Sequence, residues 1–96
     1  MKILETAVAG TMESSDIMIT IEPLESGGIQ IELNSPVEKQ FGNQIRACIK
    51  ETVCEFGVEH VRIRAVDKGA LDCTIAARVA TAVYRAGKST EYNWEV

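Results

Sequence analysis

Hydrophobic and polar residues alternate along three segments of the chain. Isoleucine occupies every second position of residues 17–21, and isoleucine and leucine do so in residues 29–33. Residues 61–66 repeat the pattern with valine, isoleucine and alanine in alternate positions. A period of two places neighbouring side chains on opposite faces of a strand. The pattern therefore predicts three strands with one buried face each, and the short run T-A-V-A-G-T before them predicts a fourth.

Two further segments, residues 37–56 and about 70–86, repeat their apolar residues every three or four positions, as an amphipathic α-helix does. Ser35, Pro36 and Glu38 stand in the order of a capping box with proline at the first helical position. A glycine after each segment predicts its end. The predicted apolar positions are Val37, Phe41, Ile45, Ile49, Val53 and Phe56 in the first helix, and Leu71, Ile75, Val79, Ala82, Val83 and Ala86 in the second.

The resulting order of elements is β-β-β-α-β-α. One apolar sheet face and two apolar helix surfaces predict an α+β fold, a two-layer sandwich with a mostly antiparallel sheet of about four strands and two helices on one face. The loop P-L-E-S-G-G predicts that the strands of residues 17–22 and 29–33 pair as a hairpin. The sequence M-E-S-S-D is the predicted turn between the first two strands.

Length and charge narrow the classes of function. The 96 residues fit a single domain, 1–96, whose aperiodic end, residues 88–96, we expect to be loosely held. A net charge of −4 argues against a nucleic-acid surface, which needs clustered lysine and arginine. No apolar run reaches the roughly 20 residues of a membrane span, and the first residues lack the apolar core of a signal peptide. We therefore expect a cytoplasmic protein.

The residues alone indicate no catalytic site. His60 is the only histidine, and its place before a strand predicts a solvent-facing side chain. The three cysteines form no C-x-x-C pair and, with one histidine, no zinc set. Arg62, Arg64, Arg78 and Lys68 either form a solvated face or converge on an anionic substrate. The second possibility leaves open a small enzyme that uses the three arginines.

Residues 13–16 read E-S-S-D. Serine and aspartate in such a turn bond nearby backbone N–H groups, so a plain polar turn is the ordinary interpretation. The tip of a hairpin is also exposed, and its backbone is not needed by the sheet. It is therefore a place where a covalent group can be presented to another enzyme. Spacing alone does not select between the two.

Three blocks together resemble the acyl carrier proteins, or gamma subunits, of citrate lyase: A-V-A-G-T-M-E-S-S-D, S-P-V-E-K-Q-F-G and D-K-G-A-L-D-C. The resemblance runs from residue 1 to about residue 87, and the tail with its W-E pair is similar too. In that family the first serine of E-S-x-D is esterified to 2'-(5''-phosphoribosyl)-3'-dephospho-coenzyme A. The resemblance therefore implies Ser14 as the attachment residue. Glu13 and Asp16 beside it are candidates for docking to basic residues of the attaching enzyme, and plain solvation of the turn is their alternative role. The family more often shows E-S-G-D, so Ser15 is a departure that adds a second hydroxyl.

The resemblance also implies a function. The chain would carry acetyl and citryl groups as thioesters between a transferase (alpha) subunit and a lyase (beta) subunit, and would itself catalyse neither step. A prosthetic-group transferase and an acetylating ligase would be transient partners. The chemistry belongs to the cofactor, which suits a sequence without a catalytic constellation.

Two alternatives to this interpretation stay open beside the arginine enzyme. The first is the carrier subunit of malonate decarboxylase, which uses a similar prosthetic group. The second is a small α/β module that binds a partner without any covalent modification. The S-P-V-E-K-Q-F-G and D-K-G-A-L-D-C blocks are more similar to citrate lyase.

Overall fold

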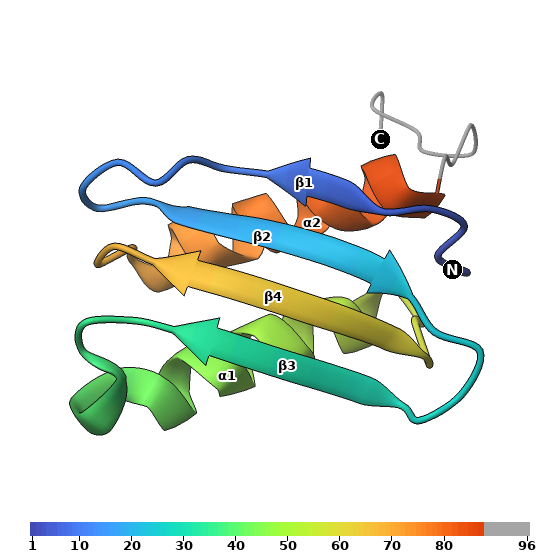
Figure 1. The fold of residues 1–96 in the computed structure, drawn as a ribbon, viewed down its shortest axis with the longest axis horizontal. Helices are drawn as coiled ribbons and strands as arrows, with labels where there is room; N and C mark the ends of the chain where they lie inside the picture. Colours follow the sequence, from blue (N-terminus) through green and yellow to red (C-terminus); the bar gives the residue numbers. More distant parts are fainter. Residues whose placement is uncertain (88–96) are drawn as a thin grey trace.

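Four strands form one sheet, and two helices cover one of its faces (Figure 1). The computed structural model describes residues 1–87; the tail expected at residues 88–96 lies outside the described residues. The elements are β1 (Ala7–Ala9), β2 (Ile17–Pro23), β3 (Ile29–Asn34), α1 (Glu38–Glu55), β4 (Val61–Asp67) and α2 (Asp72–Gly87). The predicted α+β sandwich and its order of elements are confirmed.

The order of strands in the sheet is β1-β2-β4-β3. β2 runs antiparallel to both β1 and β4, and β3 runs parallel to β4. The predicted pairing of β2 with β3 is therefore wrong, because β4 lies between them. The N–H of Val61 donates to the carbonyl of Gly28 at 3.0 Å, so β4 enters the sheet beside the loop that was expected to be a hairpin turn.

The core lies between the sheet and the helices. The strands contribute their alternate side chains, and the helices contribute the side chains of their apolar stripes. The fully buried residues of the two central strands and the two helices include Ile17, Ile19, Ile21, Val61, Ile63, Ile49, Val53, Ile75, Val79 and Val83. Burial of this apolar surface is the main force that holds the two layers together.

The predicted capping box of the first helix is wrong. α1 begins at Glu38, with no side chain bonded to its first N–H groups. The hydroxyl of Ser35 instead accepts from the N–H of Val37 and donates to a carboxylate oxygen of Asp67 at 2.9 Å. Asp67 is only 1% exposed, and a buried carboxylate needs such donors. The Ser35 side chain, which the local pattern assigned to capping the helix, is thus used in a hydrogen bond to Asp67.

Two apolar positions predicted for the helix stripes are exposed instead of buried. Phe41 is 43% exposed and Leu71 is 71% exposed. Phe41 lies in the first turns of α1, beyond the part of the helix that the sheet covers, and Leu71 precedes α2. The starts of α1 and α2 lie at the end of the molecule where β3 and β4 finish (Figure 1).

The arginines do not converge, so the hypothesis of an arginine-based enzyme is wrong. Arg64 lies on the uncovered face of the sheet, where its Nε is 3.2 Å from a carboxylate oxygen of Glu22 and 3.2 Å from one of Glu32. Arg78 belongs to α2, on the covered face, and pairs with Asp16. The sheet separates the two cations.

The side chains of the cysteines differ in exposure. Cys54 and Cys73 are exposed and Cys48 is half-buried. The Cys48 thiol donates to the carbonyl of Asp72 at 3.6 Å. Burial, with smaller contributions from the charges of Asp72 and Glu51, raises the pKa of this thiol. Cys48 is therefore a structural thiol and a poor nucleophile.

Candidate functional site

The loop of residues 10–16 joins β1 to β2 at the end of the sheet where β4 finishes and α2 begins (Figure 1). β1 and β2 pair antiparallel, so the predicted hairpin at this place is confirmed. Two hydrogen bonds join the backbone of this loop to Lys68, the residue that follows β4. The N–H of Ser15 donates to the carbonyl of Lys68 at 2.8 Å, and the N–H of Lys68 donates to the carbonyl of Asp16 at 2.9 Å.

A tight turn forms the tip of this loop. The N–H of Asp16 donates to the carbonyl of Glu13 at 3.2 Å, which makes Ser14 and Ser15 the two central residues of a β-turn. Ser15 has φ +66° and is the one non-glycine residue of positive φ in the described part of the chain. A left-handed residue at the third position of a turn favours glycine. A glycine at this position, as in an E-S-G-D motif, would adopt this backbone conformation without strain.

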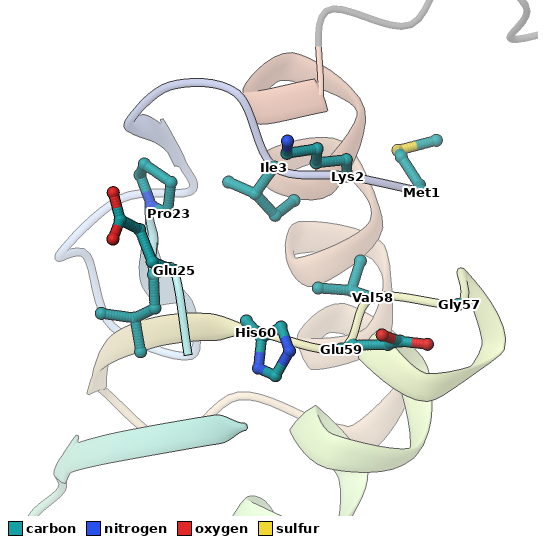
Figure 2. Close-up of a pocket in the computed structure, with 10 residues that line it drawn as sticks. Met1, Lys2, Ile3, Pro23, Glu25, Gly57, Val58, Glu59 and His60 are labelled. Atoms are coloured by element: carbon teal, nitrogen blue, oxygen red, sulfur yellow. The ribbon is translucent and has the colours of Figure 1, made fainter. Parts of the chain in front are cut away.

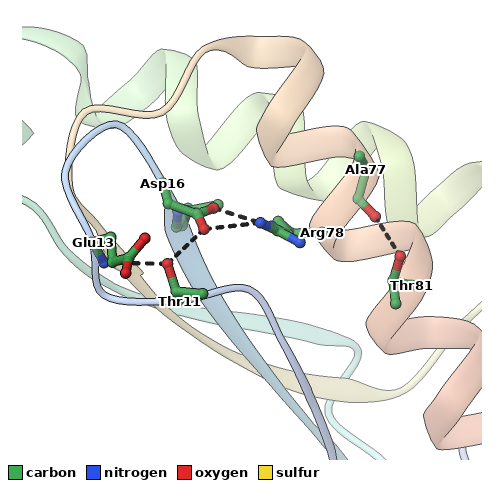
Figure 3. A network of polar contacts seen from close by, with 7 residues as sticks. Thr11, Glu13, Asp16, Ala77, Arg78 and Thr81 are labelled. Atoms are coloured by element: carbon green, nitrogen blue, oxygen red, sulfur yellow. Dashed lines mark hydrogen bonds and ion pairs between the residues drawn. The ribbon is translucent and has the colours of Figure 1, made fainter.

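Asp16 anchors the loop through four hydrogen bonds (Figure 3). Its two carboxylate oxygens accept from Nε and Nη2 of Arg78 at 3.0 and 2.9 Å. They also accept from the hydroxyl of Thr11 and the N–H of Ile17, each at 2.7 Å. A bidentate arginine–carboxylate pair fixes geometry as well as charge. The turn that carries the serines is therefore held against α2 through Arg78.

These contacts predict a pH dependence. The Arg78 hydrogen bonds, then those of Thr11 and Ile17, hold the pKa of Asp16 well below its ordinary value of 3.8. A depressed pKa contributes stability that is complete above the ordinary value and is lost as pH falls toward the folded-state value. We expect the gap in unfolding free energy between the wild type and Asp16→Asn to be constant near neutral pH and to shrink below pH about 4. Urea titrations of both proteins between pH 7 and 3 measure it, and a gap that does not change with pH would contradict the assignment.

Gly10 allows the other side of the loop to close. Its φ is +94°, and a Cβ atom there would lie 1.9 Å from the carbonyl oxygen of Ile17 and 3.2 Å from Cδ of Arg78. Only glycine lets the two backbone segments approach in this way. The sequence analysis gave Gly10 no role and considered Arg78 only as part of a cationic face, not as the partner of Asp16. The small-residue run before E-S-S-D was a signal for Gly10, whereas nothing local could pair residues 16 and 78.

The side chain of Ser14 is exposed, and its hydroxyl forms no hydrogen bond with any of residues 1–87. The carboxylate of Glu13 is also exposed and forms no ion pair within the same residues. His60 lies at the other end of β4, seven residues away along a strand, or roughly 20 Å. The described chain thus places no general base beside Ser14. Ser14 is therefore an exposed hydroxyl that no side chain of residues 1–87 activates through a hydrogen bond.

A second concave region lies at the opposite end of the molecule (Figure 2). This open cleft of about 930 Å³ is lined by Met1, Lys2, Ile3, Pro23, Leu24, Glu25, Gly57, Val58, Glu59 and His60. Its histidine is exposed as predicted and accepts the N–H of Gly28 through Nδ1 at 3.1 Å. None of the lining residues is a serine, threonine or cysteine, so the cleft offers no hydroxyl or thiol for covalent attachment.

The described residues also lack membrane-spanning helices and metal-binding groups. None of the helices in residues 1–87 combines the length and apolar character needed to cross a membrane. Within the same range, histidine, cysteine, aspartate and glutamate side chains form no group of three that could hold a metal ion.

Comparison with solved structures finds chains with a similar fold. A chain of the crystal structure of a Pseudomonas malonate decarboxylase hetero-tetramer in complex with malonate matches with a TM-score of 0.75. The match covers 86% of this chain and 84% of the other at 18% sequence identity. At that identity the similarity shows a shared fold.

Comparison of sequences shows the family. A model for acyl carrier proteins described as "Malonate decarboxylase delta subunit (MdcD)" matches residues 4–86. The citrate lyase acyl carrier protein of Streptococcus equi subsp. equi is 60% identical over 95 residues, which are 99% of this chain and 93% of that protein. Those of Streptococcus mutans and Lacticaseibacillus casei are 56% and 55% identical over the same shares. These relatives identify a carrier and not a catalytic subunit, and the chain belongs to the citrate lyase acyl carrier protein family.

Proposed function

We propose that this protein carries acetyl and citryl groups during the cleavage of citrate to acetate and oxaloacetate, on a coenzyme A-derived group esterified to Ser14. Its partners would be the transferase (alpha) and lyase (beta) subunits of a cytoplasmic citrate lyase. The citrate lyase acyl carrier proteins that are 55–60% identical to it over nearly their full length support this function. All 96 residues would act as one carrier domain.

The observation that carries the proposal is the state of Ser14. Its hydroxyl is exposed and unbonded within residues 1–87, on a turn whose backbone is fixed by Lys68 and whose flank is fixed by Arg78. A serine in this position is reachable from outside, and its modification disturbs no described contact. These features fit 2'-(5''-phosphoribosyl)-3'-dephospho-coenzyme A as a group held through one ester bond. The bound group supplies the terminal thiol on which an acyl group travels as a thioester.

The role of the carrier's own residues would then be to hold the attachment turn in place. The anchored turn fixes the origin of the arm, because Asp16, Arg78 and the Lys68 backbone prevent the loop from moving independently of the sheet. A tethered acyl group reaches an effective concentration in the millimolar range at each active site within its reach. The carrier therefore needs no substrate pocket of its own beside Ser14.

Glu13 and Asp16 remain the proposed docking acids, but we expect them to contribute unequally to docking. Arg78 already pairs with the charge of Asp16, whose side chain is 14% exposed. The carboxylate of Glu13 is exposed and unpaired in the described chain. We therefore assign the contact with a basic residue of the attaching enzyme mainly to Glu13, and assign to Asp16 the shape of the turn.

A carrier function in malonate decarboxylase is the second candidate. It is favoured by the family model, whose description names the delta subunit of that enzyme, and by the fold shared with the Pseudomonas structure. The 18% identity to that structure is far below the 55–60% identity to the citrate lyase carriers, which favour the first function.

Intact-mass measurement tests the attachment site. Protein produced together with the attachment machinery of a citrate-fermenting cell is expected to gain the mass of the phosphoribosyl dephospho-coenzyme A group. Ser14→Ala is expected to lose the whole gain. Ser15→Gly is the matched control, because it removes the second hydroxyl while supplying the residue that the positive φ favours. It should load like the wild type and unfold at equal or higher denaturant concentration.

Two outcomes would contradict the proposal. Wild-type protein that keeps its unmodified mass beside an active attachment machinery would point to a module that binds its partners without covalent modification. Loading that persists in Ser14→Ala and disappears in Ser15→Gly would move the attachment to Ser15.

A further inference from the structure

Exposed apolar side chains gather at the end of the molecule that carries Ser14. Six large hydrophobic residues are exposed in the described chain, namely Met1, Leu4, Val8, Met12, Phe41 and Leu71. Met12, Phe41 and Leu71 belong to the loop between β1 and β2, the first turns of α1 and the connection before α2, and these segments lie at this end (Figure 1). Their exposed fractions are 54%, 43% and 71%. Single exposed apolar residues are ordinary, but a group contributed by different connections is typical of an interaction site.

Hydrogen bonds connect the segments that carry these three residues. Met12 lies in the attachment loop itself, two positions before Ser14. The loop is bonded to Lys68, three positions before Leu71. Asp72, the neighbour of Leu71, accepts from the side-chain amide of Gln44 at 3.3 Å, and Gln44 lies one helical turn after Phe41. The three residues therefore lie on segments of one end of the molecule that successive hydrogen bonds connect, with Met12 and Leu71 on the segments bonded to or following the attachment turn and Phe41 farthest from it.

Two charged side chains complete this surface. Glu13 and Lys68 are exposed, and neither forms an ion pair with another of residues 1–87. Glu13 is the first residue of the serine turn. Lys68 lies beside the turn, because its backbone forms hydrogen bonds with Ser15 and Asp16. The segments at this end thus combine exposed apolar side chains with unpaired charges of both signs, as a protein–protein contact with a polar rim does.

The position of Ser14 determines what covers this surface. An enzyme that modifies the Ser14 hydroxyl must bring its reacting atoms to within about 3.5 Å of it. A stable protein contact buries on the order of 800 Å² on each partner, which a four-residue turn cannot supply. The contact must extend over the neighbours of the turn. A subunit that later receives the acyl group would be reached through the arm, so its active site can lie farther from Ser14.

We propose that Met12, Leu71 and Phe41 form the docking surface for the enzyme that attaches the prosthetic group. This enzyme would present an apolar pocket to Leu71 and Met12 and a basic residue to Glu13. The inference rests on the proposed attachment at Ser14 and adds the residues that recognise the attaching enzyme. It also explains why two apolar positions of the helix stripes remain outside the core.

The test measures the rate at which the purified attaching enzyme loads the carrier from its coenzyme A-derived donor. Leu71→Ser suits the experiment, because the carbonyl of Leu71 already accepts the first N–H groups of α2 and serine favours such a helix start. Met12→Gln removes an apolar loop side chain at similar size. Leu4→Ser is the matched control, since Leu4 is 58% exposed and precedes β1 at the other end of the molecule.

We expect Leu71→Ser to raise KM for the carrier about tenfold with little change in kcat, as loss of one buried leucine contact implies. Met12→Gln should raise KM in the same direction, and Leu4→Ser should stay within about twofold of the wild type. Thermal melting of each variant checks that it is folded. Should Met12→Gln be unstable, Leu71→Ser decides alone.

The outcomes separate this inference from the proposed function. A wild-type chain that the attaching enzyme does not modify at Ser14 overturns the proposed function and the inference with it. Wild-type loading with an unchanged KM in folded Leu71→Ser overturns the docking surface and leaves the function standing. A loss confined to kcat, or a loss of equal size in Leu4→Ser, overturns it as well.

Discussion

Replacing Gly10 with alanine is expected to lower the free energy of unfolding by at least about 2 kcal/mol, because it combines backbone strain with overpacking. The φ of +94° belongs to a region that residues with a Cβ rarely adopt. The new Cβ would also lie 1.9 Å from the carbonyl oxygen of Ile17, which is backbone at the first position of β2 and cannot rotate away. The strand start or the loop must shift.

Urea unfolding of Gly10→Ala beside the wild type measures this effect. Gly28→Ala is the matched control: its φ is +73°, but a Cβ there would meet no atom within 4 Å. The control carries the backbone strain without the collision and should cost less. Equal losses in the two variants would show that strain alone matters, and that the close approach of Gly10 to Ile17 contributes nothing.

Replacing Ile63 with alanine is expected to cost about 3–4 kcal/mol, a large share of the 5–15 kcal/mol that stabilises most domains. Ile63 is fully buried in β4, with Ile21 of β2 opposite on one side and Ile31 of β3 on the other. Its removal leaves a cavity in the middle of the sheet, where the surrounding side chains can collapse only partly.

Ile31→Ala is the matched control for the strand order. Ile31 occupies the same row of the sheet but is only half-buried, because β3 is an edge strand. Denaturant unfolding should show a clearly smaller loss for Ile31→Ala than for Ile63→Ala. A larger loss of stability for Ile31→Ala than for Ile63→Ala would indicate that β3 lies inside the sheet and β4 at its edge. That arrangement corresponds to the predicted pairing of β2 with β3.

That pairing marks the limit of what the sequence could predict. Alternation along β2, β3 and β4 reports which face of each strand is buried, and this was correct for all three. Alternation does not report which strand lies beside which. The complete burial of Val61, Ile63 and Ala65, against the half-buried isoleucines of β3, distinguishes the central strand from the edge, and burial becomes visible only in the folded chain.

Contacts between distant residues account for the remaining differences. The Ser35–Pro36–Glu38 pattern was sound as local chemistry, but the buried carboxylate of Asp67 engages the Ser35 hydroxyl, and α1 begins later. The E-S-S-D turn was identified, whereas its anchor was not, because Arg78 is 62 residues from Asp16. The positive φ of Ser15, which a glycine would adopt without strain, likewise became known only from the structure.

The late position of β4 in the chain affects how the protein is made. During synthesis β1, β2 and β3 emerge first, but β2 lacks its second partner and β3 lacks its neighbour until residues 61–67 follow, since both pair with β4. The serine turn takes its shape later still, because its fastenings come from Lys68 and from Arg78. A nascent or truncated chain that ends before residue 78 contains Ser14 but not the turn that presents it. An attaching enzyme that requires this turn would leave unfinished chains unmodified and reserve the costly coenzyme for completed carriers.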